Sequence, residues 1–271
     1  MGRIHVLLEE SWVDQAIAEL QQVLAAEPGN QEATSLIVAA LTRKGEDLIG
    51  AEQYNDALAV LERALGYGRD ADAVRRLIST ACTRRGHQLL QEKQVDQAIA
   101  VLQRGLRLAP QDADIKSNLC ACYCEQGRLL NNDNKYEEAI KVLEQAVQLD
   151  SQSAQARHFL QVALLNRAGQ IASGSSYRRY DQALRLAERA MELGDLSPEH
   201  RRFVAHLYNQ RGVERWNSGD RFAARGDFEK AFRLNPADPV IRQNLINAGG
   251  VPSLDGATLE EILRLLQQKR G

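Results

Sequence analysis

Apolar residues recur every three or four positions in short stretches of the chain, and polar breaks separate these stretches. One example follows the break NNDNK, where Ala139, Val142, Leu143, Ala146 and Leu149 fall on one side of a helical wheel. This spacing is typical of an amphipathic α-helix, because residues three and four apart share a helix face. The sequence therefore predicts an α-helix after the break.

The same pattern returns at a nearly constant interval along the chain. An alanine begins the apolar pattern of each unit, and successive alanines are 41, 41, 41, 44 and 41 residues apart: Ala16, Ala57, Ala98, Ala139, Ala183 and Ala224. A glycine stands 12 or 14 residues before five of them: Gly45, Gly86, Gly127, Gly169 and Gly212. Small residues allow two helices to cross closely. Each unit is thus predicted to be an antiparallel pair of helices, a first (A) helix with the glycine and a second (B) helix with the alanine.

Further columns accompany the glycine and the alanine. A large apolar residue follows the alanine by four positions in most units, and a proline ends several second helices: Leu20, Leu61, Leu102, Leu143, Phe228; Pro28, Pro110, Pro236. Over nearly the whole chain this pattern resembles the tetratricopeptide repeat, whose usual period is about 34 residues. The resemblance implies an all-α, right-handed superhelical solenoid of helix hairpins. The seven extra residues of the 41-residue period are expected to lengthen the first helix at its N-terminal end.

The two ends of the chain depart from the repeat. Residues 1–250 are expected to form a solenoid of about six repeats, the first of them truncated, because the glycine column would fall at Ile4. A shortened cap or an excised piece of a longer protein would explain the truncation, and excision is favoured because solenoid ends need complete caps. Residues 251–271 are expected to form a C-terminal capping helix, since Leu259, Ile262 and Leu266 share one face.

Composition and motifs exclude several classes of protein. Lys plus Arg (34) nearly balance Asp plus Glu (36), so nucleic acid is an unfavoured partner. The chain has no run of 18 apolar residues, so no membrane-spanning helix is expected. The four cysteines lack the spacing of a secreted disulfide framework, which favours the cytoplasm. No phosphate-binding glycine loop, metalloprotease motif or nucleophile elbow occurs, so neither an enzyme nor a cofactor is expected.

The candidate site lies on the first helices, which the resemblance places along the inner groove. The columns three and two residues before the glycine and one after it are mostly polar, and we expect their members to bind a protein or peptide partner: Thr42, Arg43, Thr83, Arg84, His87, Cys124, Arg128, Asn166, Arg167, Asn209 and Gln210. Amides and hydroxyls would bond to an extended peptide backbone, and the arginines would meet acidic groups. The alternative is that these are ordinary solvated residues whose arginines pair with nearby carboxylates.

The stretch CACYC needs its own interpretation, because it holds three of the four cysteines. The columns of Cys120 and Cys122 are small or apolar elsewhere, so these thiols are expected to pack inside. Cys124 shares its column with Thr42 and Asn166, and is expected to face the groove and react fastest with thiol reagents. One helix cannot supply four tetrahedral ligands, so no metal site is expected.

The sequence thus predicts a protein-interaction scaffold that takes a partner segment in a preformed groove. Co-chaperones of the tetratricopeptide-repeat family bind a C-terminal carboxylate with lysines and asparagines at set positions of the groove. Those positions hold Thr42, Glu46, Thr83 and His87 here, so the resemblance does not imply a carboxylate-binding site. Three alternatives stay open: an interaction domain cut from a larger chaperone, signalling or regulatory protein; a single-stranded RNA-binding repeat; and a homo-oligomer built by end-to-end stacking.

Overall fold

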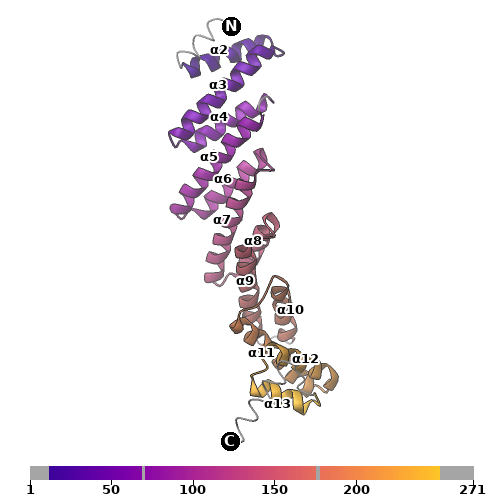
Figure 1. The fold of residues 1–271 in the computed structure, drawn as a ribbon. Coiled ribbons are helices and arrows are strands. Elements are labelled where there is room, and N and C mark those ends of the chain that lie inside the picture. The colour runs from indigo at the N-terminus through magenta and orange to yellow at the C-terminus, as the bar shows by residue number, and fades with distance from the viewer. Residues whose placement is uncertain (1–11, 69–70, 175–177, 251–271) are drawn as a thin grey trace, which may run out of the picture. The chain divides into compact units, whose positions relative to one another are not determined.

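The computed structural model describes residues 12–68, 71–174 and 178–250 (Figure 1). These residues contain only helices, arranged as successive antiparallel hairpins, which confirms the all-α repeat fold. The A helices are α3 (Gln31–Gly50), α5 (Ala71–Gln91), α7 (Ala113–Asn132), α9 (Ala154–Ala172), α11 (Pro198–Asn217) and α13 (Pro239–Asn247). The B helices are α2 (Val13–Ala26), α4 (Tyr54–Gly66), α6 (Val95–Leu108), α8 (Tyr136–Leu149), α10 (Arg179–Glu192) and α12 (Arg221–Leu234).

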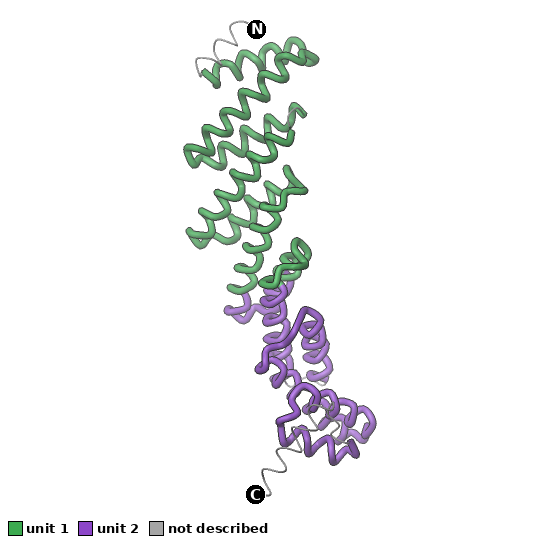
Figure 2. Tube along the Cα trace, viewed as in Figure 1, with its two compact units in different colours: residues 1–129, 142–156 green, residues 130–141, 157–271 purple. Residues whose placement is uncertain are grey.

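The chain divides into two compact units, shown in different colours in Figure 2. Unit 1 comprises residues 1–129 and 142–156, and unit 2 comprises residues 130–141 and 157–271. From α2 to α6 and from α10 to α13, each helix packs mainly on its neighbours in the chain. This is the contact pattern of a repeat protein, in which each repeat buries its apolar face on the next. The expected capping helix at 251–271 and the column position at Ile4 lie outside the described residues.

The small columns lie where the two helices of a hairpin meet. The six alanines that begin the apolar patterns of the B helices are all fully buried. A Cβ added at Gly45 would stand 2.6 Å from Leu61 Cδ2, and one at Gly212 would stand 2.6 Å from Phe228 Cε1. The glycine therefore leaves room for the large residue four positions after the alanine. At Gly169 that position holds Ala187, and an added Cβ would stand 3.6 Å from its nearest neighbour.

A repeated turn joins the A helix to the B helix. A single residue with positive φ ends the turn at Glu52, Lys93 and Asn134 (60° each), and Gly219 (93°) takes this place before α12. The backbone N–H of the next residue donates to the carbonyl five residues earlier, as from Gln53 N to Leu48 O at 2.9 Å. This bond satisfies a carbonyl that the helix end would otherwise leave without a donor.

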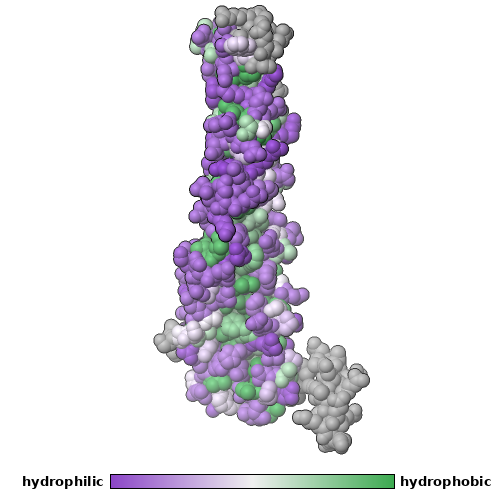
Figure 3. Space-filling view, turned by 90° about the vertical axis from the view of Figure 1, so that its left-hand side faces the viewer, coloured by the Kyte–Doolittle hydropathy of each residue, from purple (hydrophilic) through white to green (hydrophobic). Residues whose placement is uncertain are grey.

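The face drawn in Figure 3 is largely hydrophilic, with smaller hydrophobic patches between polar side chains. Within the described ranges, no helix has the length and apolar character needed to span a bilayer.

Candidate functional site

A polar bridge links several B helices to the next A helix. An acidic residue two positions before the B-helix alanine accepts a bond from a residue 30 positions later. Lys44 bonds to Asp14 and Arg167 bonds to Glu137 in this way. Gln126 Nε2 donates to Asp96 Oδ1 at 2.7 Å, and Arg211 Nη1 donates to Asp181 Oδ1 at 3.0 Å. We call these contacts the A–B bridges.

The A–B bridges change the interpretation of one predicted site residue. Arg167 was expected to meet acidic groups of a partner, but its guanidinium bonds to Glu137 and to Gln170 within unit 2. The Arg167–Glu137 ion pair is thus a contact between successive repeats of this chain. The sequence contained the signal, because an acid and a base or amide recur 30 positions apart.

The column three residues before the glycine does not face a groove, which corrects the prediction. Cys124 is 1% exposed and Asn209 is 6% exposed. Asn209 Oδ1 accepts from Asn244 Nδ2 at 2.9 Å, and Asn166 Nδ2 donates to Asn131 Oδ1 at 3.0 Å. Short polar side chains are stable between helices when they are hydrogen-bonded. The polar character of this column therefore reports packing between A helices.

The two threonines of this column behave similarly. Thr42 Oγ1 donates to Val38 O of its own helix at 2.7 Å, and both Thr42 and Thr83 are half-buried. The Thr83 hydroxyl is buried and has no hydrogen-bond partner among the described residues. Neither side chain offers an open hydroxyl to a ligand.

The prediction that Cys124 faces a groove is wrong, because its side chain is buried. All four cysteines are free and buried. Burial raises the pKa of Cys124 to about 12, with a further contribution from Cys120, and burial alone raises the pKa of Cys122 to about 11. A thiol held neutral is a poor nucleophile and a poor metal ligand. Within the described ranges, no three His, Cys, Asp or Glu side chains are arranged to hold a metal ion.

The columns two before and one after the glycine do face outward on the A helices of unit 1. Arg43, Arg84 and His87 are exposed, and His87 Nε2 lies 2.8 Å from Asn118 Oδ1 of the next A helix. Arg128 is half-buried and donates to Glu125 at 2.6 and 2.8 Å, and this bond lowers the pKa of Glu125. We call this surface the A-helix face: Arg43, Glu46, Arg84, His87, Glu125 and Arg128. In unit 2, the predicted residue Gln210 is half-buried.

A second polar contact links successive B helices. Arg104 Nε of α6 donates to Glu62 Oε1 of α4 at 2.5 Å, and the same two columns hold Lys230 and Glu188, 3.9 Å apart, in α12 and α10. We call these contacts the B–B bridges. Each places an ion pair over the surface between two B helices.

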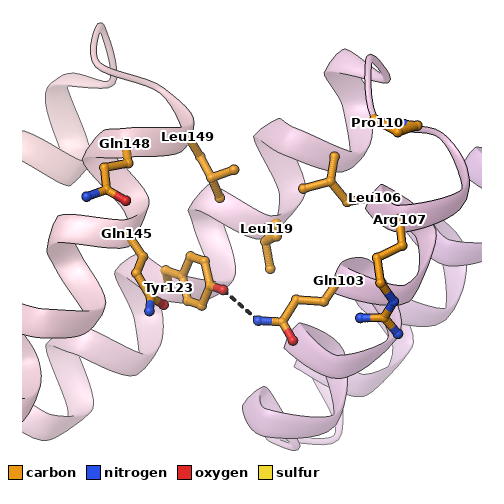
Figure 4. Close-up of a pocket in the computed structure, with 9 residues that line it drawn as sticks. All are labelled: Gln103, Leu106, Arg107, Pro110, Leu119, Tyr123, Gln145, Gln148 and Leu149. Atoms are coloured by element: carbon orange, nitrogen blue, oxygen red, sulfur yellow. Dashed lines mark hydrogen bonds between the residues drawn. The ribbon is translucent and has the colours of Figure 1, made fainter.

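Between α6 and α8 the same two columns hold Gln103 and Gln145 instead of an ion pair. A cavity of about 570 Å³ lies there, in unit 1, and Figure 4 shows its lining. The lining residues come from α6 and the following loop, α7, and the C-terminal half of α8: Gln103, Leu106, Arg107, Pro110, Leu119, Tyr123, Gln145, Gln148 and Leu149. We call this cavity the α6–α8 groove. The sequence analysis did not identify it.

Unit 2 contains a buried ionic network that the sequence analysis also missed. Asp227 is 2% exposed and accepts bonds from Arg211 at 2.7 and 2.9 Å and from Arg215 at 2.9 Å. Tyr208 donates to Glu188 at 2.6 Å, and burial together with this bond raises the pKa of Tyr208. The signal would have been Asp227 itself, a charged residue at a helical position between Ala224 and Phe228.

Two family models match the chain, and both describe the tetratricopeptide repeat. One matches residues 89–129 and the other matches residues 121–153. These ranges contain α6, α7 and α8, and thus the whole lining of the α6–α8 groove. No curated protein sequence matches the chain.

Several solved structures are similar to the chain at low sequence identity and low TM-score. The tetratricopeptide-repeat domain of P58(IPK) is 19% identical, with a TM-score of 0.30 over 99% of this chain and 78% of that one. MamA from AMB-1 is 22% identical, with a TM-score of 0.32 over 77% and 97%. A repeat protein from Parabacteroides merdae is 17% identical, with a TM-score of 0.25 over 92% and 97%. The two family matches lie within residues 89–153, and the tetratricopeptide-repeat similarity covers that part of the chain.

Proposed function

We propose that this tetratricopeptide-repeat protein is an interaction scaffold whose unit 1 binds a partner segment along the A-helix face. Repeats of this family generally serve protein interaction, which supports the scaffold. The observation that carries the proposal is the outward position of the same two columns on three neighbouring A helices: Arg43 and Glu46 on α3, Arg84 and His87 on α5, Glu125 and Arg128 on α7. A repeated, preformed surface takes an extended segment with little loss of scaffold entropy.

Charge suggests what such a segment carries. Arg84 is exposed and forms no ion pair with any described residue, and His87 lies three positions further along the same exposed side of α5. An acidic side chain of a partner would give Arg84 a bidentate bond. We therefore propose a protein or peptide partner with at least one carboxylate opposite α5.

The scaffold is proposed to act by stoichiometric binding in a reducing cytoplasm, where its four free cysteines would stay reduced. We further propose that residues 251–271 cap the last repeat. Support for a cap comes from α13, which ends at Asn247 after nine residues, whereas the A helices α3 to α11 have 19 to 21 residues.

Charge reversal at Arg84 tests the proposed function. Peptides that bind the wild-type chain are selected from a random displayed library, and the dissociation constant of the best binder is measured by fluorescence anisotropy. We expect Arg84→Glu to weaken binding at least tenfold, about 1.4 kcal/mol, because a carboxylate would then face a carboxylate. High salt should weaken wild-type binding.

The matched control is Arg63→Glu, which reverses an exposed arginine on the B helix α4, away from the A-helix face. It should leave the dissociation constant within about twofold, since a distant surface charge acts mainly through screened fields. Equal binding by wild type and Arg84→Glu would contradict the proposal. A selected ligand without acidic residues would contradict its charge component.

A further inference from the structure

The α6–α8 groove differs in charge from the α4–α6 and α10–α12 pairs. Glu62 and Arg104 bridge α4 to α6, and Glu188 and Lys230 approach each other between α10 and α12. In the same columns Gln103 and Gln145 carry neutral carboxamides. Replacing an ion pair by two amides removes both the charges and the contact that spans the two helices.

Apolar side chains form the floor and sides of the groove. Leu119 and Tyr123 of α7 form the floor and are nearly buried, at 2% and 7% exposed. Leu106 and Leu149, half-buried, and Pro110, exposed, stand around this floor (Figure 4). The volume of about 570 Å³ falls within the range of about 300–1,000 Å³ that is typical of ligand sites.

Carboxamides and one cation form the rim. Gln103 Nε2 donates to the Tyr123 hydroxyl at 2.7 Å, which holds both side chains in place. Gln145 and Gln148 are exposed and make no side-chain hydrogen bond with any described residue. A carboxamide offers both a donor and an acceptor, as does each residue of a peptide backbone. Arg107 is the only charged residue of the lining.

These features select an occupant. A helical ligand satisfies its backbone internally and would leave the glutamines unused, whereas an extended segment presents free N–H and C=O groups to them. From Gln103 to the end of α6 at Leu108 the rim runs about 7.5 Å, at 1.5 Å per residue, and Pro110 of the following loop extends it. An extended peptide covers this length with about three residues. Its side chains would enter a floor that has no counter-charge to offer.

We propose that the α6–α8 groove is a second binding site, which takes an extended, uncharged peptide segment with apolar side chains. Gln145 and Gln148 bond to its backbone, and its side chains pack on Leu106, Leu119 and Leu149. The site uses the B-helix side of unit 1 and none of the residues of the A-helix face, so it stands independently of the proposed function.

The test uses capped hexapeptides of Leu, Val, Pro and Ser, each paired with a variant in which Lys replaces the central Leu, because the one charged residue of the lining, Arg107, cannot pair with a lysine. Binding to the full chain is followed by NMR of the glutamine side-chain NH₂ groups. We expect the uncharged peptides to shift the resonances of Gln145 and Gln148, and the charged variants to bind at least tenfold more weakly. A buried unpaired charge opposes binding strongly.

The decisive variant introduces into the groove the kind of ion pair that links α4 to α6. Gln103→Glu/Gln145→Arg places the two charges of Glu62 and Arg104 over the groove, and should weaken binding of uncharged peptides at least tenfold. Both substituted residues are exposed, so the fold should survive, and circular dichroism checks this. Arg63→Glu serves as the control and should bind as the wild type does.

Several results would overturn the proposal. One is the absence of any shift at Gln145 and Gln148 up to millimolar peptide. Equal binding of charged and uncharged peptides, or full binding by the bridged variant, would be others. Shifts that grow with protein concentration in the absence of peptide would mean that a second copy of the chain occupies the groove.

Discussion

Gly127 and Gly226 both lie inside helices, but only Gly127 has a neighbour where a side chain would begin. A Cβ at Gly127 would stand 2.4 Å from Cγ of Leu143, which is fully buried and so has little freedom to move. Nothing lies within 4 Å of the corresponding point at Gly226. The first glycine is required by packing, and the second is not required by any described contact.

Alanine substitution at the two glycines should therefore have opposite effects. Gly127→Ala should lower the free energy of unfolding by about 1–3 kcal/mol, the usual cost of overpacking a core. Gly226→Ala should raise it by about 0.5–1 kcal/mol, because alanine is the better helix former. Urea unfolding followed by circular dichroism measures both. Similar changes from the two substitutions would contradict this account of the glycine column.

The buried thiols give a second prediction at this scale. In the folded chain Cys124 should react with a thiol reagent at pH 8 no faster than Cys122, and both should react orders of magnitude more slowly than in urea-unfolded chain. The reason is that thiolates react, and burial raises both pKa values well above the ordinary 9.0. Mass spectrometry of the labelled peptides identifies each site. Rapid labelling of Cys124 alone would restore the original prediction.

The same pKa shifts set a pH dependence. The folded-state pKa of Cys82 is raised to about 12, mainly by burial, so the folded chain holds this proton more tightly than the unfolded chain does. The thiols thus contribute stability that is present below pH 9 and is lost as the pH rises toward 11 or 12. The decline should be smaller in a variant with alanine at Cys82, Cys122 and Cys124.

At the scale of elements, the sequence predicts the hairpins well because the spacing of small and large residues reflects packing directly. Gly45 faces Leu61 and Gly212 faces Phe228, as two helices that cross at a small residue require. The outward columns could also be predicted. Arg43, Arg84 and His87 are exposed, as the polar character of their columns predicts.

The inward polar column could not be assigned in the same way. Asn166 and Asn209 are polar by type, but their side chains bond to Asn131 and Asn244 of neighbouring A helices. Residue type does not distinguish a solvated amide from one satisfied between helices, since both remove the cost of an unbonded polar group. Cys124 in the same column shows that the position itself is buried.

The α6–α8 groove escaped prediction for a related reason. It is defined by the loss of a contact, because Gln103 and Gln145 stand where Glu62 and Arg104 form a bridge. A contact between residues 42 positions apart can be recognised only after the register of successive B helices is known. With that register, comparison of the same columns across repeats shows which pair lacks its charges.

At the scale of the whole molecule, the repeats should respond to damage locally. In each unit the helices from α2 to α6 and from α10 to α13 contact mainly their chain neighbours, so stability is close to a sum of local terms. The ionic network in unit 2 offers a strong perturbation. The side chains of Asp227 and Arg211 are 3% and 14% exposed, whereas those of Asp14 and Lys44 in unit 1 are 77% and 32% exposed.

Asp227→Ala should therefore lower the free energy of unfolding of unit 2 by at most about 3–5 kcal/mol, because the mostly buried Arg211 loses its bonds to Asp227 and keeps only the more exposed Asp181 as a carboxylate partner. Asp14→Ala, the matched loss of a surface bridge, should cost at most about 1 kcal/mol. Hydrogen exchange followed by mass spectrometry should show faster exchange in α10 to α13 of the Asp227 variant, while α3 to α6 keep wild-type protection. Loss of protection in all of these helices together would mean that the chain unfolds as one cooperative body, and local additivity would then be wrong.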